Sequence, residues 1–148
     1  MTEHWFYHLE ASTVQSVLPG LMEKTLQRGW RALVKLPEGQ IADVDQFLWT
    51  YQDQSFLPHG RDDEPLSDQQ PILLSSTAQA AAGANCVVLI DGAEVADLSG
   101  VSRCIVMING RNQESIARER KRWNALKQAG ETLSYWQQDE RGQWKKKA

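Results

Sequence analysis

Short apolar runs alternate with helical stripes along the first hundred or so residues of the chain. The runs are rich in aliphatic and aromatic residues and are separated by turn residues, which is typical of strands in a sheet. This alternation predicts an α/β fold in which crossover helices connect the strands of a mostly parallel sheet. The expected strands are Glu3 to Leu9, Arg31 to Leu36, Pro71 to Ser75, Cys86 to Asp91 and Arg103 to Ile108.

The spacing of apolar residues predicts a helix between the first two strands and a second helix after Pro37. The first helix buries the stripe Val14, Val17, Leu18, Leu21, Met22 and Thr25. It is expected to be capped by Ser12 or Ser16, with Pro19 near its first turn. The second helix places Val44, Phe47, Leu48 and Tyr51 on about one third of a helical wheel.

Trp49 falls well off the apolar stripe of the second helix. It is either an exposed or half-exposed anchor for a partner, or a Trp packed under the following segment. That segment, from Asp53 to Gln70, is predicted to be a long polar loop, and loops of this length are often functional.

A third, long helix is expected from Asn112 to Ala129, with Gly130 as its C-terminal cap. Beyond it, Thr132 to Gln137 and Gln143 to Lys145 flank a turn and predict a terminal hairpin or extended arm.

Positive charge is concentrated in this C-terminal part. From Arg111 onward there are ten Lys and Arg residues against five Asp and Glu, a net charge of +5, whereas residues 1 to 110 carry −8. A positive, aromatic-bearing helix on an otherwise acidic protein is suited to an acidic partner, because opposite charge steers the encounter. The alternative is an ordinary solvated helix face.

Length and composition favour one globular domain over residues 1 to 148. No apolar run approaches the roughly 18 residues of a membrane span, and Met1-Thr2-Glu3-His4 lacks the basic and apolar stretches of a signal peptide, so a cytoplasmic protein is expected. Cys86 and Cys104 lie in predicted strands and are expected to be buried thiols.

The motifs of common α/β enzymes are missing from the sequence. Neither G-x-x-x-x-G-K-[ST] nor G-x-G-x-x-G occurs, and the turn Glu10-Ala11-Ser12-Thr13 after the first strand has no glycine to approach a phosphate. Asp91-Gly92 is interpreted as a turn rather than part of a metal site. Three scattered histidines and two strand cysteines form no zinc motif, so neither catalysis nor a cofactor is expected, with an enzyme that has an unrecognised site as an alternative.

The third helix carries the most informative cluster. At about 100° per residue, one narrow wedge contains Ile116, Arg120, Trp123 and Lys127, while Arg118 and Arg122 point elsewhere. This set suits a short peptide that ends in a hydrophobic residue and a free carboxylate. It also suits single-stranded nucleic acid. In a third alternative, Ile116 and Trp123 face the core with Leu126, and the two cations only flank them.

Four stretches spread over essentially the full chain form a further set of motifs. They are Leu48-Trp49, Ser55-Phe56-Leu57-Pro58-His59-Gly60, Ala117-Arg118-Glu119-Arg120 with Trp123 and Gly130 beyond it, and Tyr135-Trp136-Gln137-Gln138 with Gly142, Trp144 and Lys146-Lys147-Ala148. Together they resemble the chi subunit of bacterial DNA polymerase III holoenzyme.

This resemblance implies a non-catalytic clamp-loader protein with a Rossmann-like, three-layer fold. It implies binding to the acidic C-terminal tail of single-stranded DNA-binding protein and pairing with the psi subunit or another clamp-loader component. It also implies a repair helicase as an alternative partner, and contact with DNA that is mainly indirect.

The resemblance assigns roles to individual residues. Arg120 and Trp123 match the tail-binding arginine and aromatic residue, although alignment on Ala-Arg-Glu-Arg would select Arg118 instead. Helical phase favours Arg120, because it shares a face with Trp123. Trp49 matches a Trp linked to the tail site, and Phe56 matches a Phe linked to psi and the helicase.

The chain departs from the family pattern at one position of this site. A family lysine corresponds to Ile116 here, which leaves Lys127 as its substitute.

Overall fold

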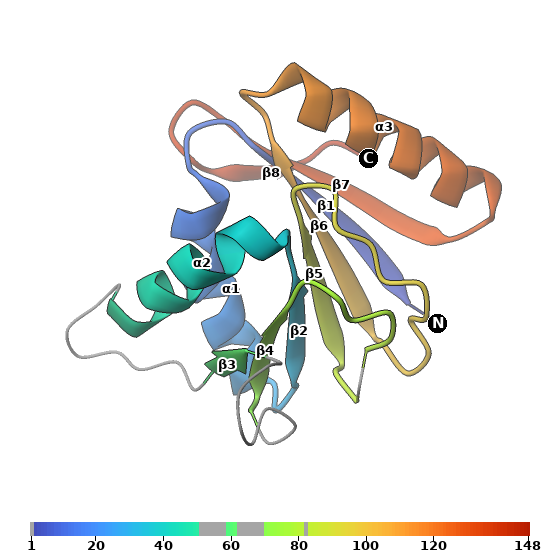
Figure 1. Ribbon diagram of the computed structural model, residues 1–148. Coiled ribbons are helices and arrows are strands. Elements are labelled where there is room, and N and C mark those ends of the chain that lie inside the picture. The colour runs from blue at the N-terminus through green and yellow to red at the C-terminus, as the bar shows by residue number, and fades with distance from the viewer. Residues whose placement is uncertain (1, 51–58, 62–69, 82) are drawn as a thin grey trace.

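The computed structural model describes residues 2–50, 59–61, 70–81 and 83–148 (Figure 1). Three helices and eight strands are assigned in this part of the chain. In chain order they are β1 (Glu3–Leu9), α1 (Val14–Gln27), β2 (Ala32–Lys35), α2 (Glu38–Thr50), β3 (His59–Arg61), β4 (Ile72–Ser75), β5 (Cys86–Ile90), β6 (Arg103–Asn109), α3 (Gln113–Gln128), β7 (Thr132–Gln138) and β8 (Trp144–Lys146).

All eight strands form one sheet in the order β3-β4-β2-β5-β6-β1-β7-β8. Every neighbouring pair is parallel except β7 and β8, which form the predicted C-terminal hairpin. Helices α1 and α2 cover one face of the sheet and α3 covers the other, which gives three layers (Figure 1). The predicted Rossmann-like α/β fold with a mostly parallel sheet is therefore confirmed.

Each face of the sheet has its own apolar core. Leu18 and Met22 of α1 pack on one face together with the buried stripe of α2, and Phe6 of β1 lies on the other face under α3. All residues of β2 and β5 are buried because these strands are covered from both sides. The sequence pattern is thus explained by burial on two faces of one sheet.

Two local predictions for α1 were wrong. Its N-cap is Thr13, whose side chain accepts a hydrogen bond from the backbone N–H of Ser16, while the Ser16 hydroxyl accepts one from the N–H of Thr13. Because the helix begins at Val14, Pro19 lies inside it rather than near its first turn. Pro19 is buried, so apolar packing offsets the hydrogen bond that the ring cannot donate.

The predicted loop from Asp53 to Gln70 contains a short strand, β3, which the sequence analysis missed. His59 in this strand is 4% exposed, and its Nε2 lies 3.0 Å from Asp45 Oδ1 of α2. The strand is only three residues long and polar, which leaves no periodic signal in the sequence.

Both cysteines are free and buried, as expected. Burial raises the pKa of the Cys86 thiol to about 11 and that of Cys104 to about 12, so both remain protonated at neutral pH. In the described part of the chain, no helix is both long and apolar enough to cross a membrane.

Candidate functional site

Helix α3 begins where Asn112 accepts a hydrogen bond from the backbone N–H of Ser115 through its side chain. Three of its side chains, Ile116, Trp123 and Leu126, pack on the core of that face of the sheet. The Trp123 ring makes edge contacts with the rings of Phe6 and Tyr135, at centroid distances of 5.2 and 5.5 Å. The core-facing alternative is therefore correct for these apolar residues, although Ile116 and Trp123 keep part of their surface exposed.

One edge of α3 faces the turn after β5, and its arginines are paired. Glu119 is 1% exposed, and its carboxylate lies 3.1 Å from Arg118 Nε and 3.1 Å from Arg122 Nε. The Arg118 guanidinium also lies 3.4 Å from Asp91, whose φ of 51° beside Gly92 confirms the predicted turn. Arg122 donates to the carbonyl oxygen of Ala93. Both arginines are held by this protein's own acceptors.

The other edge of α3 faces β1 and β7 and carries Arg120 and Lys127. Both side chains are exposed, and neither forms a hydrogen bond or ion pair with another described residue. The charge of Arg120 contributes to lowering the pKa of His8 and opposes the raised pKa of Tyr135, so this edge of the helix faces these two groups. This edge therefore presents positive charge that no described carboxylate neutralises.

His8 and Tyr135 connect this edge to the sheet. His8 Nδ1 and the Tyr135 hydroxyl are 2.6 Å apart, and His8 Nε2 lies 3.1 Å from a carboxylate oxygen of Glu10. Burial lowers the pKa of His8, Glu10 raises it, and Arg120 lowers it further. Burial raises the pKa of Tyr135, while Arg120 opposes that shift. His8 is thus kept neutral mainly by burial and supports the Tyr135 ring against which Trp123 packs.

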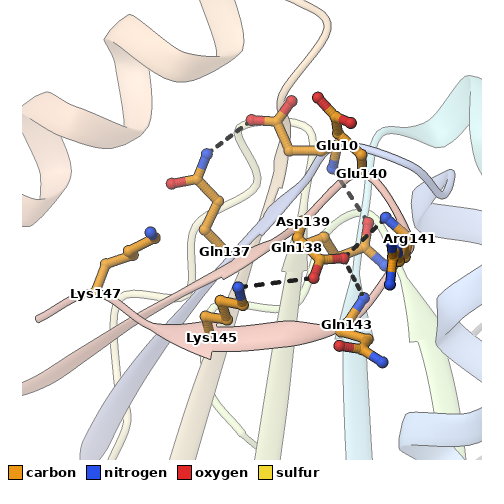
Figure 2. Close-up of a pocket in the computed structure, with 9 residues that line it drawn as sticks. All are labelled: Glu10, Gln137, Gln138, Asp139, Glu140, Arg141, Gln143, Lys145 and Lys147. Carbon is orange, nitrogen blue, oxygen red and sulfur yellow. Dashed lines mark hydrogen bonds and ion pairs between the residues drawn. The ribbon is translucent and has the colours of Figure 1, made fainter.

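An open cavity of about 680 Å³ lies between the end of β1 and the β7–β8 hairpin (Figure 2). It is lined by Glu10, Gln137, Gln138, Asp139, Glu140, Arg141, Gln143, Lys145 and Lys147. Gln137 donates to Glu10 at 2.8 Å, and Lys145 lies 3.9 Å from Asp139. Glu10 lines this cavity and also contacts His8, so the cavity adjoins the Arg120 edge of α3 and extends toward Lys147. The cavity is also lined by three carboxylates, those of Glu10, Asp139 and Glu140.

Gln138 occupies the position where many α/β proteins bind a phosphate, at the backbone amides that follow the first strand. Its side-chain oxygen accepts hydrogen bonds from the N–H groups of Glu10, Ala11 and Ser12 at 3.1, 3.2 and 3.2 Å. Gln138 is 4% exposed. The protein's own amide oxygen therefore satisfies these donors, and no local motif in the sequence signals this contact.

The described residues contain no group of three or more His, Cys, Asp and Glu side chains that could hold a metal ion. His4, His8 and His59 are instead buried, each next to one carboxylate: Glu131, Glu10 and Asp45, respectively. They are therefore core histidines, each buried beside one carboxylate.

Trp49 is 48% exposed, which agrees with the exposure expected of an anchor, while its role as an anchor stays a prediction. Its ring contacts the His59 ring in a tilted arrangement, with a centroid distance of 4.7 Å, at the end of the sheet formed by β3 and β4. Helix α3 instead packs against β6 and β7 on the opposite face. The structure therefore does not bring Trp49 together with Arg120. Phe56 lies outside the described residues.

Together these observations describe an α/β domain whose last helix has a basic edge beside aromatic side chains. A family model described as DNA polymerase III chi subunit, HolC, matches residues 1–134. The chain belongs to this family, which supports an accessory role in DNA replication. A probable DNA polymerase III subunit chi from Rickettsia prowazekii (strain Madrid E) is 24% identical over 106 residues. The match covers 71% of this chain and 64% of that relative, so this chain spans somewhat less than two thirds of its length.

Proposed function

We propose that this protein is a non-catalytic accessory subunit that links the clamp loader of DNA polymerase III to single-stranded DNA-binding protein. The link is the acidic C-terminal tail of that protein, bound along the edge of α3 that carries Arg120 and Lys127. Membership in the chi family supports this role, which is exercised in the cytoplasm.

The observation that carries the proposal is the difference between the arginines of α3. Arg118 and Arg122 share the buried carboxylate of Glu119, whereas Arg120 has no partner among the described residues. A guanidinium that is already paired must break that contact before it can bind a new carboxylate, but Arg120 binds without this cost. This asymmetry favours Arg120 over Arg118 as the group that holds the terminal carboxylate.

The surroundings of Arg120 suit the rest of such a tail. Trp123 and Ile116 expose part of their apolar surface next to Arg120 and offer contacts for a terminal hydrophobic side chain. Lys127 lies about two turns further along the same edge, and Lys147 of the C-terminal segment lies toward the cavity. These two lysines suit the acidic residues that precede the C-terminus of the tail peptide. The Glu10 carboxylate limits how many acidic side chains of the peptide can bind near the cavity.

We assign Trp49 to a second partner surface rather than to the tail site, because it lies at the other end of the sheet. In this proposal Trp49 and Phe56 contact the psi subunit, another clamp-loader component or a repair helicase. Separate surfaces would allow the two partners to bind at the same time.

The test is calorimetric titration with a peptide of the acidic tail, beside the same peptide without its last two residues. We expect binding of the complete peptide only. Arg120→Ala should weaken it by about 30-fold, or roughly 2 kcal/mol, because a charge-assisted contact to the terminal carboxylate is lost. Arg118→Ala, which removes an arginine from the same helix, is the matched control and should bind nearly as wild type. Equal binding by Arg120→Ala and wild type would refute the assignment.

A further inference from the structure

An aromatic surface lies on the face of the sheet opposite to α3. On that side α1 packs mainly against β2 and β6 and α2 against β3 and β4, so β1, β7 and β8 lie at the margin of the area that these helices cover, and their aromatic side chains are only partly buried against the core. Four half-buried rings occupy this area: Trp5, Tyr7, Trp136 and Trp144. The centroid of Trp5 lies 5.8 Å from that of Trp136 and 6.2 Å from that of Tyr7, and Tyr7 lies 4.8 Å from Trp144. The rings thus form one continuous series across three strands.

Cations alternate with these rings. The Arg103 guanidinium lies 3.7 Å from the centre of the Trp5 ring and 5.4 Å from that of Trp30, and Arg28 lies 4.9 Å from the same Trp30 ring. At the other end, Lys146 is directly opposite Trp136 in the β7–β8 ladder, which places both side chains on the same face.

These three cations, Arg28, Arg103 and Lys146, form no ion pair with a described carboxylate. Glu3 is an acidic group on this face, and it accepts a hydrogen bond from Trp5 Nε1 at 3.2 Å. As on the Arg120 edge of α3, positive charge is therefore available to an anionic partner.

We propose that this aromatic face, formed by Arg28, Trp30, Arg103, Trp5, Tyr7, Trp136, Trp144 and Lys146, binds single-stranded DNA. Unpaired bases stack on the accessible parts of such half-buried rings while neighbouring cations contact the phosphates, and this combination is tolerant of sequence. DNA is chosen over RNA because the chain belongs to a DNA polymerase subunit family. Duplex DNA fits poorly, since its bases are already stacked within the helix.

The surface is small. From β6 to β8 there are three strand spacings of about 4.8 Å each, which corresponds to a short stretch of nucleotides. The protein as a whole has a formal net charge of −3. Binding is therefore weak and depends on salt, with a slope of about −2 in log affinity against log salt if three phosphates are contacted. The face becomes useful where another contact already holds the protein close to the strand.

The test uses the full chain and fluorescence anisotropy of a labelled oligo(dT) of about 12 nucleotides at low salt. We compare the double variant Arg28→Gln/Lys146→Gln with Lys121→Gln/Arg141→Gln, which removes the same charge from exposed positions outside the aromatic face. The first pair should weaken binding about tenfold and reduce the salt slope, and the second should change affinity less than threefold. Thermal unfolding of each variant shows that the fold is kept.

Three results would overturn the proposal. They are no binding of oligo(dT) by the wild type, equal weakening by the two double variants, or tighter binding of the matched duplex or of oligo(U). Titration with the tail peptide separates this proposal from the proposed function. The Arg28→Gln/Lys146→Gln variant should keep wild-type affinity for the peptide, and Arg120→Ala should keep its affinity for oligo(dT).

Discussion

The two edges of α3 carry similar charges in the sequence but differ in what they can bind. On the edge toward β5, Arg118 and Arg122 surround the buried carboxylate of Glu119. On the edge toward β7, Arg120 and Lys127 have no carboxylate partner among the described residues. A cluster of basic residues is therefore a poor guide to a binding site until the internal partners of each cation are known. The edge toward β5 is held by internal ion pairs, and the edge toward β7 is the one that we propose binds acidic groups.

The largest effect should follow from Glu119→Gln. This change removes the carboxylate but leaves the Arg122 guanidinium, whose side chain is only 14% exposed, without its main partner. We expect the free energy of unfolding to fall by about 3 kcal/mol, because an uncompensated buried charge is costly. Loss of the contact between Glu119 and Arg118 contributes less to this destabilisation, because the Arg118 side chain is 40% exposed and its charge is screened by water. Urea denaturation measures the change.

The control for this variant is Glu114→Gln, an exposed position in the first turn of the same helix, with an expected change of about 0.5 kcal/mol or less. The folded Glu119→Gln protein should still bind the tail peptide normally, because the Arg120 edge is unaltered. A neutral effect of Glu119→Gln on stability would remove the distinction between the two edges.

A smaller effect is expected for Lys127→Ala on binding of the tail peptide. An exposed ammonium that contacts an acidic side chain contributes little in water, so the affinity should fall two- to threefold and more at low salt. Lys121→Ala, an exposed lysine of α3 outside the Arg120 wedge, should have no measurable effect. Calorimetry at two salt concentrations compares the two variants, and equal losses would show that only the overall charge of the helix matters.

The smallest expected effect is a change in the pKa values of His4 and His8, which lie near the Arg122 edge and the Arg120 edge of α3, respectively. Burial lowers the pKa of both His4 and His8 below the ordinary value of 6.5, and an arginine of α3 lowers each further: Arg122 for His4 and Arg120 for His8. The unfolded chain therefore binds more protons than the folded one below pH 6.5, and stability falls as the pH drops through this range.

Arg120→Ala should raise the pKa of His8 and leave that of His4 unchanged. NMR titration of the imidazole signals measures both values in one sample, with Arg118→Ala as the reference variant. A shift of His4 together with His8 would mean that the substitution alters the packing of the whole helix rather than one edge.

Much of the fold follows from local sequence patterns. The alternation of buried and less buried residues in β1 and the apolar stripe of α1 each follow from burial of one face of the element. Asn112 and Gly130 mark the two ends of α3. Strand β3 could not be predicted in this way, because three polar residues carry no period.

The candidate binding edge could be predicted only in part. Helical phase correctly separates Arg120 from Arg118, since phase is a property of the helix alone. Helical phase does not reveal that Glu119 is buried, because a glutamate with basic neighbours in the sequence is typical of a solvent-exposed helix face. The contact of Gln138 with the amides after β1 spans more than 120 residues of sequence and likewise has no local signal.

The position of β1 in the sheet has a consequence for synthesis of the chain. This strand is made first, yet both of its neighbours, β6 and β7, come from the last third of the protein. At about 5–20 residues per second, a ribosome needs roughly 6–26 s between finishing β1 and completing both of its partners. During this interval the apolar strand has no native pairing available, whereas β2, β4 and β5 can already associate. The nascent β1 segment is therefore a natural client for a chaperone that shields extended apolar chain, and it can pair natively only after β6 and β7 have been made.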